Sequence, residues 1–180
     1  MLIARRLLAA ALVVLAAGCG GSARPSAAAG GGPSAPKKPA PGQFLQIMSA
    51  KHAVDLTLIA SDGDSNNGFN FDDYGRGELL VSVPRGWRVT VHCKNDGPLR
   101  NSCAVVSGPF PTAPAFPGAT TPKPVVGLES GQSASFSFVA TRTGTYRLAS
   151  LVAGHEQARM WDVLEVTRGG QPSISARPGP

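Results

Sequence analysis

The chain has 180 residues and a formal net charge of +6. Its excess positive charge lies near the two ends, because the part from Leu45 to Arg168 contains eleven basic and eleven acidic residues. This balance excludes the continuous basic surface that nucleic-acid binding requires, so we expect no nucleic-acid partner. Aromatic residues are few, and no long segment has the apolar period of an amphipathic helix, which favours a single β-rich domain.

The amino-terminal residues have the parts of a secretory signal. Arg5 and Arg6 supply positive charge, and Leu7 to Ala17 is an uncharged apolar stretch that leads through small residues to Cys19. The stretch is shorter than the ~20 residues that a permanent membrane-spanning helix needs. We therefore predict that residues 1–18 are a signal peptide and that the rest of the chain is exported.

Cys19 lies in a context that suggests a lipid anchor. The stretch Leu15-Ala16-Ala17-Gly18-Cys19 resembles the bacterial lipobox, in which the cysteine thiol is acylated and becomes the new first residue. Acyl chains anchor stably, since each buried CH2 contributes ~0.8 kcal/mol. The sequence predicts a protein held on the extracytoplasmic side of a membrane by a lipid on Cys19. The alternative is an ordinary cleaved signal with an incidental cysteine.

Two segments flank the predicted domain. Residues 19–42 are rich in Gly, Ala, Ser and Pro and have no hydrophobic periodicity. Such a segment cannot bury enough apolar surface to offset its ordering entropy, so we expect a flexible tether. Residues 169–180 are similar in composition and are expected to form a disordered tail. The folded domain is therefore placed at residues 43–168.

Within the domain, apolar residues alternate with polar ones, which is the period of a β-strand. Turn signals such as Asn95-Asp96-Gly97-Pro98 separate the alternating runs. The pattern predicts seven or eight short strands and hence a two-sheet sandwich. The apolar positions of the runs are Val54, Leu56 and Leu58; Leu79, Val81 and Val83; Trp87, Val89, Val91 and Cys93; Cys103 and Val105; Phe136 and Phe138; Tyr146 and Leu148; and the run from Trp161 to Val166.

Two other segments are predicted to be loops. Ser107 to Pro124 contains six prolines, so we expect a long surface loop there instead of a strand. Asp62 to Gly68 has the acidic residues and glycines of a calcium loop. Its glycine falls one position late for an EF-hand and no flanking helices are visible, so a polar turn is favoured.

The carboxyl-terminal half resembles a known family. The segment from Gly144 to Trp161, with Gly131-Gln132-Ser133 and Phe136 to Ala140 before it, resembles the end of a cupredoxin of the sulfocyanin type. The stretch Gly77 to Asn95 resembles the middle strands of the same family. The likeness covers roughly residues 69–166, and it implies a cupredoxin-like Greek-key β-sandwich.

The resemblance also implies a set of copper-ligand positions. Type 1 copper is bound by two histidines and a cysteine thiolate in a trigonal plane, with a weak axial methionine. The family positions of cysteine, second histidine and methionine fall on Ser150, His155 and Met160, and the first histidine aligns with Asn101. A serine hydroxyl is not ionised at neutral pH, and a neutral amide is a poor copper ligand. We therefore predict that copper is lost, that the loop keeps its shape, that His155 is a surface residue and that Met160 packs inside.

The remaining cysteines are Cys93 and Cys103. Each alternates with inward-facing valines, and the resemblance places their strands in facing sheets. We therefore expect a disulfide between them, which an oxidising compartment permits. The alternative is that one of them supplies the sulfur that copper would need.

Together these features predict a membrane-tethered, non-enzymatic module that binds an envelope protein or stabilises an assembly, without a cofactor. The alternative is a copper protein. It would be an electron carrier like its relatives, or a weak copper carrier that uses His155 and Met160 with help from Met48, His52 or His92.

A hydrolytic enzyme is the least supported class. Ser150 precedes His155 closely in the chain, but no Gly-x-Ser-x-Gly elbow or ordered acid accompanies the pair. Their closeness follows from the spacing of the family's copper ligands and needs no catalytic triad.

Overall fold

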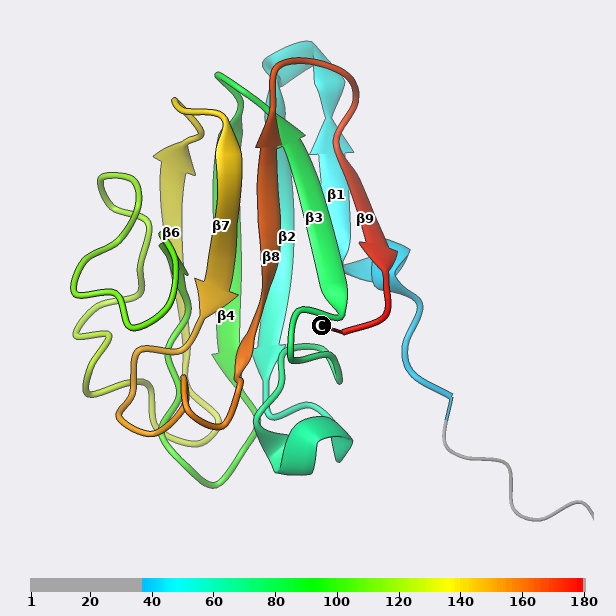
Figure 1. Ribbon diagram of the computed structural model, residues 1–180. Coiled ribbons are helices and arrows are strands. Elements are labelled where there is room, and N and C mark those ends of the chain that lie inside the picture. The colour runs from blue at the N-terminus through cyan, green and yellow to red at the C-terminus, as the bar shows by residue number, and fades with distance from the viewer. Residues whose placement is uncertain (1–36, 180) are drawn as a thin grey trace, which may run out of the picture. The chain divides into compact units, whose positions relative to one another are not determined.

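The computed structural model describes residues 37–179, so the predicted signal peptide, Cys19 and most of the predicted tether lie outside the described residues. This part of the chain forms nine strands and three short 3-10 turns (Figure 1). None of these helical turns has the length and apolar content needed to cross a membrane. The elements in chain order are η1 (Pro41–Phe44), β1 (Leu45–Met48), η2 (Ser49–Lys51), β2 (Ala53–Ala60), η3 (Ser65–Gly68), β3 (Leu79–Pro84), β4 (Arg88–Asn95), β5 (Ala104–Val106), β6 (Ser133–Val139), β7 (Gly144–Ala149), β8 (Trp161–Thr167) and β9 (Ser173–Ala176).

The strands form two sheets that lie face to face as two layers (Figure 1). One sheet has four strands in the order β1-β2-β4-β6, and the other has five in the order β5-β7-β8-β3-β9. The pairs β2–β4 and β3–β8 are parallel, and the other neighbours are antiparallel. The predicted all-β sandwich is confirmed, with nine strands where seven or eight were expected.

The core lies between the two layers and follows the alternation in the sequence. On β2, for example, Val54, Leu56 and Leu58 are completely buried, while Asp55 and Thr57 between them are partly exposed. The inner residues of β3 and β4 are buried in the same way. Each fully buried aliphatic side chain stabilises the fold by roughly 1.5–3 kcal/mol relative to an exposed one. The seven runs of alternating residues predicted as strands are therefore correct.

The segment beyond residue 169 differs from the prediction of a disordered tail. Ser173–Ala176 forms β9, an edge strand that pairs antiparallel with β3. Ile174 packs against the core, and Arg177 donates its backbone N–H to the carbonyl oxygen of Glu78 at 2.8 Å. Backbone hydrogen bonds to β3 hold this strand. Because such bonds do not depend on the side chains, the serine-rich sequence gives little sign of a strand.

The last residues of the predicted tether are also bound to the domain. Lys38 Nζ lies 2.6 Å from Glu78 Oε2 and 5.0 Å from the ring centre of Tyr74. The Tyr74 hydroxyl donates to the carbonyl oxygen of Pro39 at 2.6 Å. Phe44, at the end of η1, is buried. The folded unit therefore begins before residue 43, and the segment 38–42 is not a free linker.

The proline-rich segment 107–124 has no strand of its own, as predicted. It also pairs with β5 and contributes a side chain to the core. It forms isolated bridges to β5, between Ala104 and Thr120 and between Val106 and Pro114. Its Phe116 is buried and stacks on Phe138, with ring centres 5.1 Å apart. The segment thus closes the open side of the core beside β5, which has only three residues.

A disulfide joins the two sheets. Cys93 lies on β4 and Cys103 immediately precedes β5, their Cα atoms are 6.0 Å apart, and both side chains are buried in the core. The bond closes the loop between residues 93 and 103 and holds Asn101 near its carboxyl end. The pairing expected for these cysteines is present, so neither has a free thiol for metal binding.

Two buried acids fix the ends of strands. Asp72 Oδ1 accepts the backbone N–H of Ile59 at 2.8 Å, and Asp162 Oδ1 accepts that of Leu79 at 2.9 Å. Both residues are completely buried, and their Oδ2 atoms have no hydrogen-bond partner among the described residues. Burial raises the pKa of Asp72 to about 8, against the opposing hydrogen bond from Ile59, and raises the pKa of Asp162 well above its ordinary value. The carboxyl group of Asp72 is therefore largely protonated at neutral pH.

Removing the disulfide should reduce stability. We expect the double variant Cys93→Ala and Cys103→Ala to lose about 2–3 kcal/mol of unfolding free energy, because the unfolded chain gains the entropy of an open loop of this length. Urea unfolding followed by tryptophan fluorescence measures the loss. The control is the wild-type protein unfolded with and without a thiol reductant. Equal midpoints under these two conditions would contradict the prediction.

Asp72 should make stability depend on pH. Its pKa is about 8 in the folded protein against an ordinary value of 3.8, so the stability it contributes is full below about pH 4 and is lost progressively as the pH rises through 8. We expect Asp72→Asn to lie close to the wild type at about pH 4 and to be more stable at about pH 9, by on the order of 1–3 kcal/mol. Urea midpoints measured across this range test it, with the partly exposed Asp55→Asn as control. Parallel curves for Asp72→Asn and wild type would contradict it.

Candidate functional site

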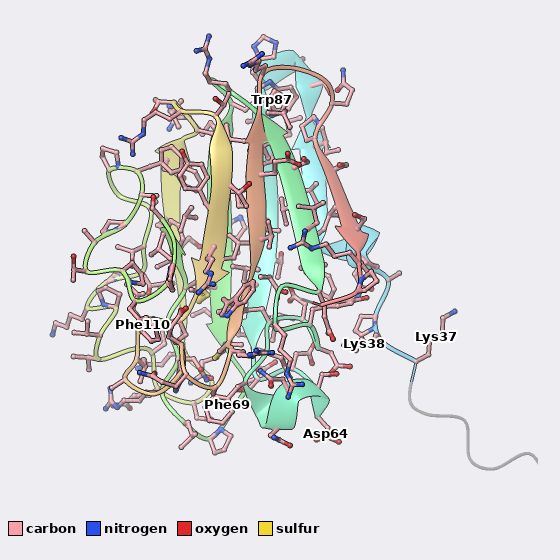
Figure 2. All side chains as sticks on the ribbon, in the orientation of Figure 1. Lys37, Lys38, Asp64, Phe69, Trp87 and Phe110 are labelled. Carbon is pink, nitrogen blue, oxygen red and sulfur yellow. A yellow bond between two sulfur atoms is a disulfide. The ribbon has the colours of Figure 1, made fainter. Side chains whose placement is uncertain are left out.

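Three loops meet at the end of the sandwich opposite Trp87, where Figure 2 labels Phe69 and Asp64. They follow β2, β4 and β7 and span residues 61–78, 96–103 and 150–160. Side-chain hydrogen bonds join them, including Asn66 Nδ2 to the Ala158 carbonyl oxygen at 2.8 Å and Asn101 Nδ2 to Ser61 Oγ at 3.2 Å. We call this region the loop end.

The four family ligand positions, Asn101, Ser150, His155 and Met160, all lie at the loop end and are all buried. The expected packing of Met160 is confirmed. The expectation that His155 is a surface residue is wrong, because its ring packs against Phe69 and its Nδ1 meets Ser150 Oγ. Pairing of β7 with β8 brings Ala149 opposite Trp161, so both ends of the 150–160 loop are held side by side. Within the loop, the Met160 N–H donates to the His155 carbonyl oxygen at 2.9 Å. The sequence spacing therefore forms a closed turn that brings the three later positions together.

Ser150 and His155 make direct contact. Ser150 Oγ lies 2.9 Å from His155 Nδ1, and it also accepts the backbone N–H of Ser102 at 3.1 Å. Ser102 Oγ lies 3.4 Å from Ser150 Oγ and accepts the N–H of Leu151 at 2.9 Å. This network links the loop after β4 to the loop after β7. Burial lowers the pKa of His155, so its imidazole is neutral at pH 7.

Asn101 occupies the first histidine position and supports the backbone. Its Nδ2 donates to Asn95 Oδ1 at 2.8 Å and to the Leu99 carbonyl oxygen at 3.1 Å. Its main chain exchanges two hydrogen bonds with Leu128. These contacts use the amide to fix the turn between β4 and β5.

The distance between Ser150 and His155 argues against a metal between them. Two ligands that share one metal, at bond lengths near 2.0–2.3 Å and angles near 110–120°, lie roughly 3.4–3.8 Å apart. The Ser150 Oγ to His155 Nδ1 distance of 2.9 Å is that of an ordinary hydrogen bond. In the described part of the chain, no group of three or more His, Cys, Asp or Glu side chains is arranged to hold a metal ion. Serine and asparagine at two of the four family positions supply neither a thiolate nor an imidazole, so the donor set present here differs from that of type 1 copper.

The additional residues considered as copper helpers lie elsewhere. His52 packs against Trp87, with ring centres 5.5 Å apart, at the opposite end of the sandwich. His92 is exposed on β4, 3.0 Å from Ser135 Oγ. Met48 ends β1. None of the three joins His155 and Met160.

A pocket of about 450 Å³ opens at the loop end beside His155. Ser61, Asp64 and Phe69 line it from the loop after β2, and Asp96 and Leu99 line it from the loop after β4. Sequence reasoning did not assign these residues to a site. The polar stretch from Asp62 to Gly68 was the available signal, and it forms η3 and one wall of the pocket.

The pocket has a negative side. Burial raises the pKa of Asp62, and the nearby carboxylates of Asp73 and Asp96 raise it further. Lys94 Nζ lies 2.7 Å from Asp96 Oδ1 and offsets part of this charge. No lysine or arginine side chain lines the pocket within the residues that the structure describes.

Several large apolar side chains in the loops are exposed. Leu99, Phe110, Val125 and Val126 belong to this group, Phe110 with 66% and Val125 with 70% exposure. Leu99 lines the pocket beside His155, and Phe110 lines a second, more open pocket with the 150–157 part of the β7–β8 loop. We call these four residues the apolar rim.

Comparison with known proteins places this architecture in a family. Residues 41–171 match the Sulfocyanin (SoxE) domain family. Sulfocyanin from Sulfolobus acidocaldarius is 30% identical over 128 residues, and the chain spans 64% of the length of that relative. The match covers 64% of this chain.

A solved structure has the same fold. A crystal structure of rusticyanin variants has a TM-score of 0.51 at 16% identity and covers 69% of this chain and 86% of its own. Reduced auracyanin from Roseiflexus castenholzii has a TM-score of 0.47 at 22% identity, covering 63% and 96%. With its two-sheet sandwich and a family match over residues 41–171, the chain belongs to the sulfocyanin family of cupredoxins.

Proposed function

We propose that this protein is an exported, lipid-tethered member of the sulfocyanin family that has lost type 1 copper and acts as a non-enzymatic binding module. The observation that carries the proposal is the direct hydrogen bond from Ser150 to His155 at 2.9 Å. It occupies the place where the family's thiolate and imidazole positions would face a shared metal.

The chemistry of the donor set supports the loss of copper. The covalent bond from a thiolate to copper defines a type 1 site, and a neutral serine hydroxyl is a hard and weak donor. The disulfide holds Cys93 and Cys103, so neither supplies a thiolate. His155 and Met160 alone are two ligands, too few to close a strong copper site.

The apolar rim supports a binding role. Exposed apolar side chains that cluster on several loops are typical of protein interaction sites. Leu99, Phe110, Val125 and Val126 meet this description. The partner we propose is an envelope protein that buries an apolar surface against them. Each exposed aliphatic or aromatic side chain covered in this way stabilises a complex through loss of its contact with water.

The Ser150–His155 pair does not support hydrolysis. Ser150 is 1% exposed, so a substrate carbonyl cannot approach its hydroxyl without a rearrangement of the loop. No acidic side chain hydrogen-bonds to His155 among the described residues. The pair lacks the third group that orients the base in a catalytic triad.

Retention of His155 and Met160 favours one second candidate, a copper-binding protein in electron transfer or copper handling. Both residues sit at family ligand positions, and both are buried at the loop end. In that case the loop would have to open the Ser150–His155 hydrogen bond to admit the metal.

Copper titration tests the two candidates. We expect the purified domain to develop no intense absorption at about 600 nm with Cu(II), because that band needs a copper thiolate. We also expect no Cu(I) binding tighter than about micromolar with two ligands alone. An intense blue colour, or tight colourless Cu(I) binding, would sink the proposal.

The matched control is the double variant Ser150→Cys with Asn101→His, which restores the family donor set. We expect it to bind Cu(II) and turn blue. A folded but colourless double variant would show that the loop backbone, as well as the two side chains, has departed from the family geometry.

The anchor is tested separately. We expect the full chain, expressed in a bacterial host with a lipoprotein pathway, to incorporate labelled palmitate and to fractionate with membranes. Cys19→Ser should lose the label and move to the soluble extracytoplasmic fraction, since one lipidated residue supplies the anchor. Palmitate labelling that is unchanged in Cys19→Ser would contradict the anchor.

A further inference from the structure

The pocket at the loop end has the size of a ligand site and a mixed lining. Its volume of about 450 Å³ lies within the range of small-molecule pockets, roughly 300–1,000 Å³. His155 contributes to its lining but is only 4% exposed, so the imidazole reaches the pocket from a fixed and buried position. The pocket is therefore built around a side chain that cannot move freely.

The hydrogen-bond network sets which nitrogen of His155 carries the proton. Ser102 Oγ and Ser150 Oγ lie 3.4 Å apart, a long hydrogen bond, and Ser150 Oγ lies 2.9 Å from His155 Nδ1. Both hydroxyl protons find an acceptor in only one arrangement, in which Ser102 donates to Ser150 and Ser150 donates to His155 Nδ1. In this arrangement the proton of the neutral imidazole is on Nε2.

The Nε2–H group points away from Ser150 and has no partner among the described residues. His155 belongs to the lining of the pocket and Ser150 does not, an arrangement consistent with the Nε2 edge of the ring facing the pocket. A ligand there meets a fixed hydrogen-bond donor, and it needs an acceptor oxygen at that point.

A second requirement comes from the acidic residues that line the pocket. Asp64 and Asp96 line it with exposed carboxyl groups, and Asp96 is also paired with Lys94 at 2.7 Å. The partly buried ring of Phe69 lines the same pocket and meets the His155 ring in a T-shaped arrangement, with ring centres 5.3 Å apart. Carboxylates beside an aromatic face are the surroundings that an organic ammonium group prefers.

We propose that the pocket binds a small organic molecule with an ammonium group a few bonds from an acceptor oxygen, the chemistry shared by a peptide amino terminus and an amino sugar. The ammonium group lies between Asp64 and Asp96, and the oxygen accepts the proton of His155 Nε2. Phe69 and Leu99 contact the carbon skeleton. The inference deepens the proposed binding role and rests on it.

The test is a titration of the 15N-labelled domain, followed by NMR at pH 6.5. The probes are a dipeptide amide with a free amino group and D-glucosamine, each paired with its N-acetylated form, which keeps the oxygens and loses the charge. We expect the free amines to shift the signals of residues 61–69 and 96–101, and one of the two to bind more tightly and so identify the source. The acetylated forms should bind at least about tenfold more weakly.

Variants locate the binding. Asp64→Asn with Asp96→Asn should weaken binding of the amine about tenfold or more without unfolding the domain, because both side chains are exposed. The matched control Asp55→Asn lies on β2 outside the pocket and should leave binding unchanged. The 15N shifts of the His155 ring should show the proton on Nε2.

Several outcomes would overturn the inference. They are NMR signals that do not shift with either amine, acetylated forms that bind as tightly as the free amines, an Asp55→Asn variant that weakens binding equally, and a His155 ring proton on Nδ1. Displacement of the amine by micromolar calcium would also do so, because it would mark the acidic residues of the pocket as a cation site. These results are distinguishable from failure of the proposed function. A protein that stays colourless with Cu(II) and does not bind the amines contradicts only the proposed ligand site. A protein that turns blue with Cu(II) contradicts the proposed loss of copper.

Discussion

Burial of alternating apolar side chains between the two sheets is the interaction on which the rest of the domain depends. β2 and β4 lie side by side in parallel, so Val54 and Leu56 align with Val89 and Val91 on one inner face. The disulfide then ties this layer to the facing one. The core and the disulfide together form the framework from which the loop end extends.

At the loop end, hydrogen bonds between side chains hold the loops together. Ser102, Ser150 and His155 connect two loops through side-chain contacts, and Asn101 fixes the turn between β4 and β5. This network directs many of its donors and acceptors at each other. In the arrangement that we propose, it leaves the Nε2–H group of His155 for the pocket.

The sequence was a good guide wherever the determining signal was local. Alternation along β2 and β4 predicted their burial. The inward-facing positions of both cysteines, together with the family resemblance, predicted the disulfide. It failed for β9, whose sequence Ser-Ile-Ser-Ala carries little apolar signal and is held by backbone pairing with β3. The pocket was equally hidden, because Phe69, Asp96 and His155 are brought together by the topology and not by spacing. The spacing of the family motif predicted the ligand positions, but only the structure shows the hydrogen bond between Ser150 and His155.

The two ends of the folded unit are attached to one turn. Lys38 binds the side chain of Glu78, and Arg177 binds the carbonyl oxygens of Gly77 and Glu78. Lys38 also lies over the ring of Tyr74, whose hydroxyl donates to the Pro39 carbonyl oxygen, so several contacts hold the amino-terminal end of the folded unit. We expect mechanical tension applied through this end to load these contacts and η1 before it loads β2 and β4, which the disulfide ties to the facing sheet.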